Sequence, residues 1–203
     1  MPEFEDLPFT ERPNLTPYLV HLTKARHGAS AFENLVKILK DGVLHGSDAS
    51  GYIKGSKKAV CFMDVPFYSL KHVLTKSNSD PNAPKYEPFG IFYSKNTAYK
   101  KGFRPVLYLS NEEIDDFNIP PGQLWRVVRL EVSDDGWISW LHEREWRKSG
   151  DFKLPTNPYG VLVKNADDAE KLRDMICESP EDFRVKPRSI IPLTVVCQGL
   201  IYL

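Results

Sequence analysis

The order of apolar and polar segments predicts an α+β fold with a largely antiparallel or split β-sheet. Short apolar runs mix irregularly with amphipathic segments, and most helical patterns fall in the first two thirds of the chain. There is no internal repeat, no heptad run and no glycine pattern of a Rossmann or phosphate-binding loop. Because the chain has 203 residues, we expect one domain over residues 1–203.

The clearest local signals lie near the beginning of the chain. Residues 1–17 contain several prolines and are expected to form an extended lead-in, and the apolar run 18–22 predicts a first strand. Ser30 and Glu33 have the spacing of a capping box, and Gly42 stands where a helix would end in a left-handed residue. The apolar residues between them repeat with helical spacing: Phe32, Leu35, Val36 and Leu39.

The remaining elements follow from apolar runs, capping signals and turn residues. Strands are expected at 59–63, 90–94, 105–109, 142–147, 159–164 and 190–196, and helices at 66–74, 95–101, from 110 onward and at 167–177. The polar stretches 46–58 and 75–88 predict loops, and residues 124–132 are compatible with either a strand or a helix.

Composition excludes several classes of protein. The formal net charge is zero, so binding to nucleic acid would require a local basic patch such as 54–58 or 100–104, and each of these is also typical of a solvated loop. The three cysteines are far apart and lack the spacing of a zinc site or disulfide framework, which favours a reducing, cytoplasmic location. The acidic first residues are unlike a signal peptide, and no apolar run has membrane-spanning length, so we expect no membrane association.

Residues 142–147, His-Glu-Arg-Glu-Trp-Arg, are the strongest functional signal. If they form a strand, Glu143, Glu145 and Arg147 share one face, and His142, Arg144 and Trp146 share the other. A glutamate flanked by arginines stays ionised and can stabilise positive charge on a sugar C1, while the arginines can bind a pyrophosphate. The alternative is an ion-pair ladder on an exposed strand, with the tryptophan filling the core.

Two further segments contain candidate ligand contacts. His21 ends the first apolar run and shares a strand face with Thr23, and a histidine at this position can hydrogen-bond a ribose hydroxyl or a substrate carbonyl. Phe67 and Tyr68 follow the second strand at a corner where aromatic rings can enclose a planar ring. For His21, the alternative is a semi-buried histidine with a structural hydrogen bond. For the corner, the alternative is that Phe67 packs it and Asp64 caps the helix.

Other chemistries have less support. The sequence has no metal-binding histidine motif and no Gly-x-Ser-x-Gly elbow, so we expect no metal. Cys61 lies inside an apolar run, where a thiol usually serves as packing. A metal-dependent nuclease built from Asp64 and Glu145 remains a third hypothesis.

Taken in order, these segments resemble the AbiGi group of phage abortive-infection proteins. More distantly, the chain is similar to the DarT-like ADP-ribosyltransferase toxins, which share the His-x-Thr opening, the helix that follows it, the Val-Pro-Phe-Tyr corner and a late glutamate before an aromatic. The matching segments lie between residues 18 and about 147: His21-Leu-Thr23, 34–44, 60–67, 86–95, 102–108 and 143–147.

This resemblance implies an ADP-ribosyltransferase-like split β-sheet core and an antiphage-defence enzyme that uses NAD to modify a nucleic acid or protein. Glu145 would be the catalytic glutamate, with His21 and Thr23 at the ribose. Phe67 or Tyr68 would lie near the nicotinamide, and Arg144 or Arg147 would bind phosphate or position Glu145. The alternative is a non-catalytic module, such as the antitoxin of a toxin–antitoxin pair, whose partner would be the cognate toxin.

Overall fold

A computed structural model describes residues 12–49, 53–80, 82–134 and 136–199. The chain forms two compact units. Unit 1 comprises Met1–Val43, Val65–Lys95 and Lys153–Leu203, and unit 2 comprises Leu44–Asp64 and Asn96–Phe152. Each unit is therefore assembled from segments that are distant in sequence.

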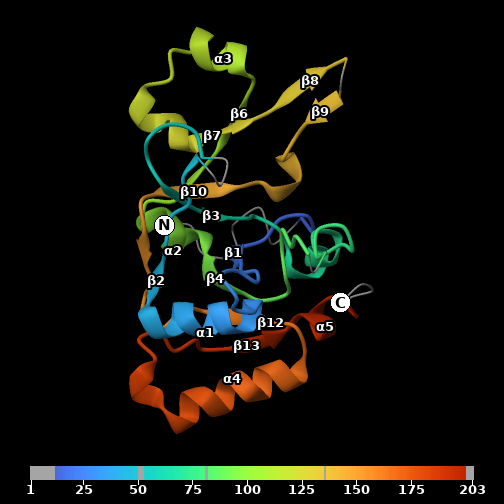
Figure 1. The fold of residues 1–203 in the computed structure, drawn as a ribbon, viewed down its shortest axis with the longest axis vertical. Helices are drawn as coiled ribbons and strands as arrows, with labels where there is room; N and C mark the ends of the chain where they lie inside the picture. The colour runs from blue at the N-terminus through green and yellow to red at the C-terminus, as the bar shows by residue number, and fades with distance from the viewer. Residues whose placement is uncertain (1–11, 50–52, 81, 135, 200–203) are drawn as a thin grey trace. The chain divides into compact units, whose positions relative to one another are not determined.

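Unit 1 is built on a four-stranded sheet with the order β1-β4-β12-β13 (Figure 1). The first three strands pair antiparallel, and the last two pair in parallel. The central strands are buried on both faces, which explains why they consist almost entirely of apolar residues. The strands are β1 (Tyr18–Leu22), β4 (Gly90–Ser94), β12 (Gly160–Val163) and β13 (Ile190–Pro192).

The helices of unit 1 begin and end where the local sequence directs. α1 (Ala31–Asp41) begins at Ser30, which forms the predicted capping box with Glu33, and it ends at Gly42 with φ of 69°. α4 (Ala166–Glu178) begins at Asn165, whose side chain accepts from the backbone of the first turn. The short helical elements are η4 (Phe67–His72), η7 (Pro180–Asp182) and α5 (Leu193–Val196).

Unit 2 contains smaller sheets. In the main one, β10 (Trp146–Ser149) lies between β3 (Ala59–Phe62) and β5 (Arg104–Pro105), antiparallel to both. β6 (Leu107–Leu109) and β7 (Val127–Arg129) pair in parallel, and β8 (Glu131–Ser133) and β9 (Gly136–Ile138) form a hairpin. The rings of Phe62, Phe103 and Phe152 pack edge to face in its core. Its helical elements are α3 (Asn111–Asp116), η5 (Pro121–Arg126) and η6 (Leu141–Glu143).

The remaining elements are short. α2 (Lys95–Lys100) follows β4 directly, and β2 (Val43–Leu44) pairs with β11 (Phe152–Lys153). Antiparallel pairs predominate over parallel ones in the described residues, so the predicted α+β class with a mostly antiparallel sheet is confirmed. Within the same residues, no helix combines the length and apolar character needed to cross a bilayer.

Several predicted elements are wrong in extent. The strand expected at 105–109 is two short strands, β5 ending at Pro105 and β6 beginning at Leu107; Val106 between them donates its backbone N–H to the carbonyl of Glu145. The strand expected at 190–196 ends at Pro192, where α5 begins. The helix expected at 66–74 is the 3₁₀ helix η4.

Candidate active site

Glu145 and Arg147 form a buried ion pair at the beginning of β10. They are two residues apart in an extended segment, so their side chains lie on the same face. Arg147 Nε donates to Glu145 Oε1 at 3.0 Å, and Nη2 donates to Oε2 at 3.0 Å. Glu145 is 7% exposed and Arg147 is 4% exposed. The two-point contact fixes both side chains in one orientation.

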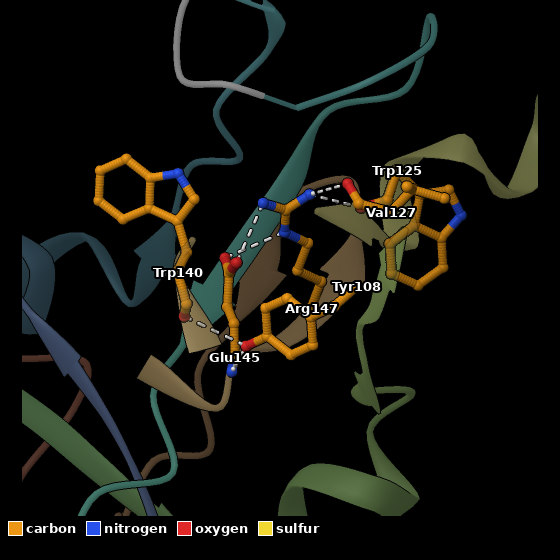
Figure 2. A network of polar contacts seen from close by, with 6 residues as sticks. All are labelled: Tyr108, Trp125, Val127, Trp140, Glu145 and Arg147. Carbon is orange, nitrogen blue, oxygen red and sulfur yellow. Dashed lines mark hydrogen bonds and ion pairs between the residues drawn. The ribbon is translucent and has the colours of Figure 1, made fainter. Parts of the chain in front are cut away.

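Arg147 also holds the adjoining η5 and the beginning of β7. Its Nη1 donates to the carbonyl oxygens of Trp125 at 3.0 Å and Val127 at 3.1 Å. Figure 2 shows the guanidinium group between these carbonyls and the Glu145 carboxylate. Burial lowers the pKa of Arg147, but the Glu145 carboxylate more than offsets this, and the pKa is raised. The arginine is therefore cationic at any physiological pH.

Tyr108 orients the backbone of Glu145. The Glu145 N–H donates to the Tyr108 hydroxyl at 3.0 Å, and that hydroxyl donates to the Trp140 carbonyl at 3.4 Å (Figure 2). Burial raises the pKa of Tyr108, so the phenol stays protonated and remains a donor. Sequence reasoning missed this residue, because no local pattern indicates a contact between residues 37 positions apart.

Cys61 lies directly opposite Arg147 in the pairing of β3 with β10. Burial raises the pKa of the Cys61 thiol well above its usual value, and the negative Glu145 carboxylate, which also accepts its hydrogen bond, raises it further. A neutral thiol is a poor nucleophile, in agreement with the packing role expected from the sequence.

The strand predicted for residues 142–147 is wrong over its first half. Leu141–Glu143 is the 3₁₀ helix η6, and Arg144 has φ of 43°, a left-handed conformation that cannot continue a strand. Arg144 Nε donates to the Asp64 carbonyl at 2.7 Å, and its Nη2 lies 3.6 Å from Asp64 Oδ1. Arg144 and His142 therefore do not share a strand face with Trp146, and Asp64 pairs with an arginine rather than capping η4, whose N-cap is Pro66.

In unit 1, His21 and Thr23 lie on the same side of β1 and of its extension. The Thr23 hydroxyl donates to the Ala31 carbonyl at 3.1 Å, with the Phe89 carbonyl as a second acceptor at 3.2 Å. Thr23 is 6% exposed, so this hydroxyl connects the end of β1 to the first turn of α1. His21 is half-buried opposite Ile91 of β4. The ribose contacts assigned to both residues remain predictions.

Phe67 and Tyr68 open η4 next to β1. The Phe67 ring stacks on Tyr18 with centroids 5.6 Å apart and planes at 15°, and it meets the edge of Phe92 at 4.8 Å. Tyr68 is about half exposed, and its hydroxyl donates to the Pro13 carbonyl. Tyr18 and His21 are three residues apart, so strand alternation directs them to opposite faces of the sheet. β1 therefore does not bring His21 onto the face that carries Phe67.

The predicted site residues thus form two groups, one in each unit. Among the residues that the structure describes, no three histidine, cysteine, aspartate or glutamate side chains are grouped as they would be around a metal ion. Unit 2 also has an open hollow of about 510 Å³ that includes none of the predicted residues. It is lined by Ala49, Ile53, Lys54, Gly55, Asn111, Ile114, Asp115 and Leu124.

No protein-family model and no curated protein matches this chain. Two solved structures match it, "Thermus sp. 2.9 DarT in complex with carba-NAD+" with a TM-score of 0.46 and "Thermus sp. 2.9 DarT in complex with NAD+" with a TM-score of 0.43. Both are 14% identical to it, and each match covers 87% of this chain and 96% of the other. An identity of 14% and TM-scores below 0.5 do not carry a function from these structures to this chain.

Proposed function

We propose that this chain is an NAD-using ADP-ribosyltransferase of antiphage defence, with a nucleic acid or a protein as acceptor. The observation that carries the proposal is the fixed orientation of the Glu145 carboxylate. Arg147, Cys61 and Tyr108 all hold it or its backbone at the beginning of the central strand of a sheet. The ordered motifs that resemble the DarT-like toxins, from His21 to Arg147, support the same activity.

The chemistry requires a carboxylate that is ionised and already in place. When nicotinamide leaves NAD, positive charge develops on the ribose carbon to which it was attached, and a fixed negative charge stabilises that change most. A carboxylate has about four lone-pair positions; Arg147 occupies one on each oxygen of Glu145 and the Cys61 thiol occupies a third, so one position can still accept from a ribose hydroxyl. Arg147 acts here by positioning Glu145.

The test is release of nicotinamide from NAD, measured with DNA, RNA and protein acceptors present. We expect Glu145→Gln to lower the rate by about 100-fold or more, the scale at which preorganised electrostatic groups contribute. Glu112→Gln is the matched control, because Glu112 is exposed on α3 and is expected to leave the rate unchanged. Equal rates for Glu145→Gln and wild type, or no release by wild type with any acceptor, would exclude the enzyme.

Loss of the Glu145 charge leaves Arg147 buried without its partner, so Glu145→Gln can fail for lack of stability. Glu145→Asp keeps the charge but withdraws the carboxylate by one methylene group. Thermal unfolding of both variants separates loss of structure from loss of chemistry. His21→Ala tests the predicted ribose contact, for which we expect a higher KM for NAD.

A non-catalytic binding module, such as an antitoxin, is the second candidate. The burial of Glu145 favours it, because a carboxylate that is 7% exposed and paired at both oxygens is also what a purely structural ion pair requires. The double variant Glu145→Leu with Arg147→Met removes both charges and leaves neither one unpaired. If the chain is a binding module, the double variant should still bind its partner. If the chain is an enzyme, the double variant should release no nicotinamide.

A further inference from the structure

Tyr159 and Arg188 stand side by side where β12 and β13 begin. The Ser189 hydroxyl donates to the Tyr159 carbonyl at 2.7 Å, and the Val161 N–H donates to the Ser189 carbonyl at 3.0 Å. The Arg188 N–H donates to the Pro158 carbonyl at 3.1 Å. These contacts fix the backbone at both residues, and the guanidinium carbon of Arg188 lies 5.9 Å from the centre of the Tyr159 ring.

Gly160 allows this close approach. A Cβ at this position would lie 2.4 Å from the Ser189 hydroxyl oxygen and 2.8 Å from a ring carbon of Phe92. Only glycine fits here, so β12 can pass against Phe92 and bring Tyr159 next to Tyr18, with ring centres 5.7 Å apart. Tyr159 thereby extends the row of rings that begins with the stacked Phe67 and Tyr18.

The rings in this row are not fully covered. Tyr159 is 45% exposed, and Tyr18 and Phe67 are partly exposed. A tyrosine ring combines a large apolar face with a polar hydroxyl, so it can contact a ligand through its uncovered face. Exposed ring surface that is continuous with a packed cluster is therefore available to a ligand with a planar ring.

Arg188 differs from Arg104, which also lies over an exposed tyrosine. In unit 2, Arg104 lies 3.8 Å from the Tyr99 ring, and its Nη1 donates to the carbonyls of Tyr99 and Phe103. The side chain of Arg188, by contrast, has no hydrogen bond or ion pair to any residue that the structure describes. Arg188 is an exposed residue beside an exposed ring, the arrangement that suits a phosphate attached to a planar base.

We propose that Tyr159 and Arg188 bind the ADP-ribose part of NAD, with the guanidinium group on the diphosphate and the Tyr159 ring against the adenine. The assignment rests on the proposed function and extends its site to residues outside the segments that resemble a known family. It places the nucleotide at the end of the unit 1 sheet where β12 and β13 begin.

The test is titration of the full chain with ADP-ribose by isothermal calorimetry. We expect Arg188→Ala to weaken binding about tenfold or more, because it removes charge-assisted hydrogen bonds. Arg188→Lys should give an intermediate loss, since lysine keeps the charge without the two-point geometry. Tyr159→Ala should weaken binding, whereas Tyr159→Phe keeps the ring and should preserve it.

Arg104→Ala with Tyr99→Ala is the matched control, a second arginine–tyrosine pair whose loss should leave ADP-ribose affinity unchanged. Equal affinity in the Arg188→Ala and control variants, or no heat of binding for wild type at millimolar ADP-ribose, overturns the assignment. Because ADP-ribose contains no nicotinamide, the titration is independent of catalysis. Tight binding of ADP-ribose without nicotinamide release would exclude the enzyme and support the Tyr159–Arg188 site. Nicotinamide release with unchanged ADP-ribose affinity in Arg188→Ala would support the enzyme and exclude this site.

Discussion

The polar network of unit 2 and the aromatic row of unit 1 use arginine in opposite ways. Arg147 is almost fully buried and shares its N–H groups among a carboxylate and two backbone carbonyls, so it has strong internal partners. Arg188 is exposed, and its guanidinium carbon lies 5.9 Å from the centre of the Tyr159 ring. The comparison shows that a charge with internal partners contributes to stability and positioning, whereas a charge left in solvent is available for a ligand.

The largest expected effect is the difference in stability between variants of these two arginines. Arg147→Met leaves the Glu145 carboxylate buried without its partner, which costs about 3–5 kcal/mol. Arg188→Met removes an exposed side chain and should change stability by less than about 0.5 kcal/mol. Urea unfolding of both variants measures the difference, and similar midpoints would mean that the buried pair contributes nothing special to the fold.

Tyr108→Phe should have the next largest effect. The change removes the hydroxyl that accepts from the Glu145 N–H and donates to the Trp140 carbonyl, so both are left without that partner. We expect a loss of about 1–3 kcal/mol in the free energy of unfolding. Tyr99→Phe, at an exposed ring, is the control and should be neutral. A neutral Tyr108→Phe would mean that water replaces the hydroxyl without cost.

The thiols should differ in reactivity. Cys61 is held neutral by burial and by the nearby Glu145 charge, which raise its pKa, whereas Cys177 is exposed. Alkylation with iodoacetamide at pH 8, followed by peptide mass spectrometry, should modify Cys177 about tenfold faster or more, because only the thiolate reacts. Labelling of Cys61 should accelerate in Glu145→Gln, where the opposing negative charge is gone. Comparable rates in wild type would place Cys61 in a different electrostatic environment.

The smallest effect concerns acid stability. Asp151 accepts hydrogen bonds from the Gly46 N–H and from His45, and these lower its pKa. A carboxyl group with a lowered pKa in the folded state stabilises the protein above its unfolded pKa of about 3.9, and that contribution disappears as pH falls through the folded value. Asp151→Asn should therefore be less stable than wild type at pH 6, with the difference shrinking below pH 4. A constant difference would show that hydrogen-bond geometry alone is responsible.

Local patterns predicted the elements whose determinants lie within one turn or one strand. The capping box at Ser30 and the left-handed Gly42 are confirmed, because each depends on contacts three or four residues apart. Strand alternation predicts a continuous strand for residues 142–147; this prediction is wrong, because Arg144 is held in a left-handed conformation with its side chain on Asp64, 80 positions away. No spacing rule includes such a contact.

In the candidate site, too, the sequence predicted contacts within a few residues but not contacts between distant segments. The Glu145–Arg147 pair follows from two residues with strand spacing, so the sequence indicated that they face the same side. Tyr108, the Trp125 and Val127 carbonyls, and the Tyr159–Arg188 pair were all missed. Each depends on neighbours that the pairing of separate strands brings together.

By itself, then, the sequence determined where this protein begins its main helices, which residues are apolar enough to form its sheets, and that a glutamate and an arginine share one face. Only the tertiary structure decided that this pair is buried with its charges satisfied, that β1 separates His21 from Phe67, and that Arg188 remains exposed. The physical reason is range: capping and strand alternation act over a few residues, whereas burial and the choice of polar partners depend on segments brought together by folding.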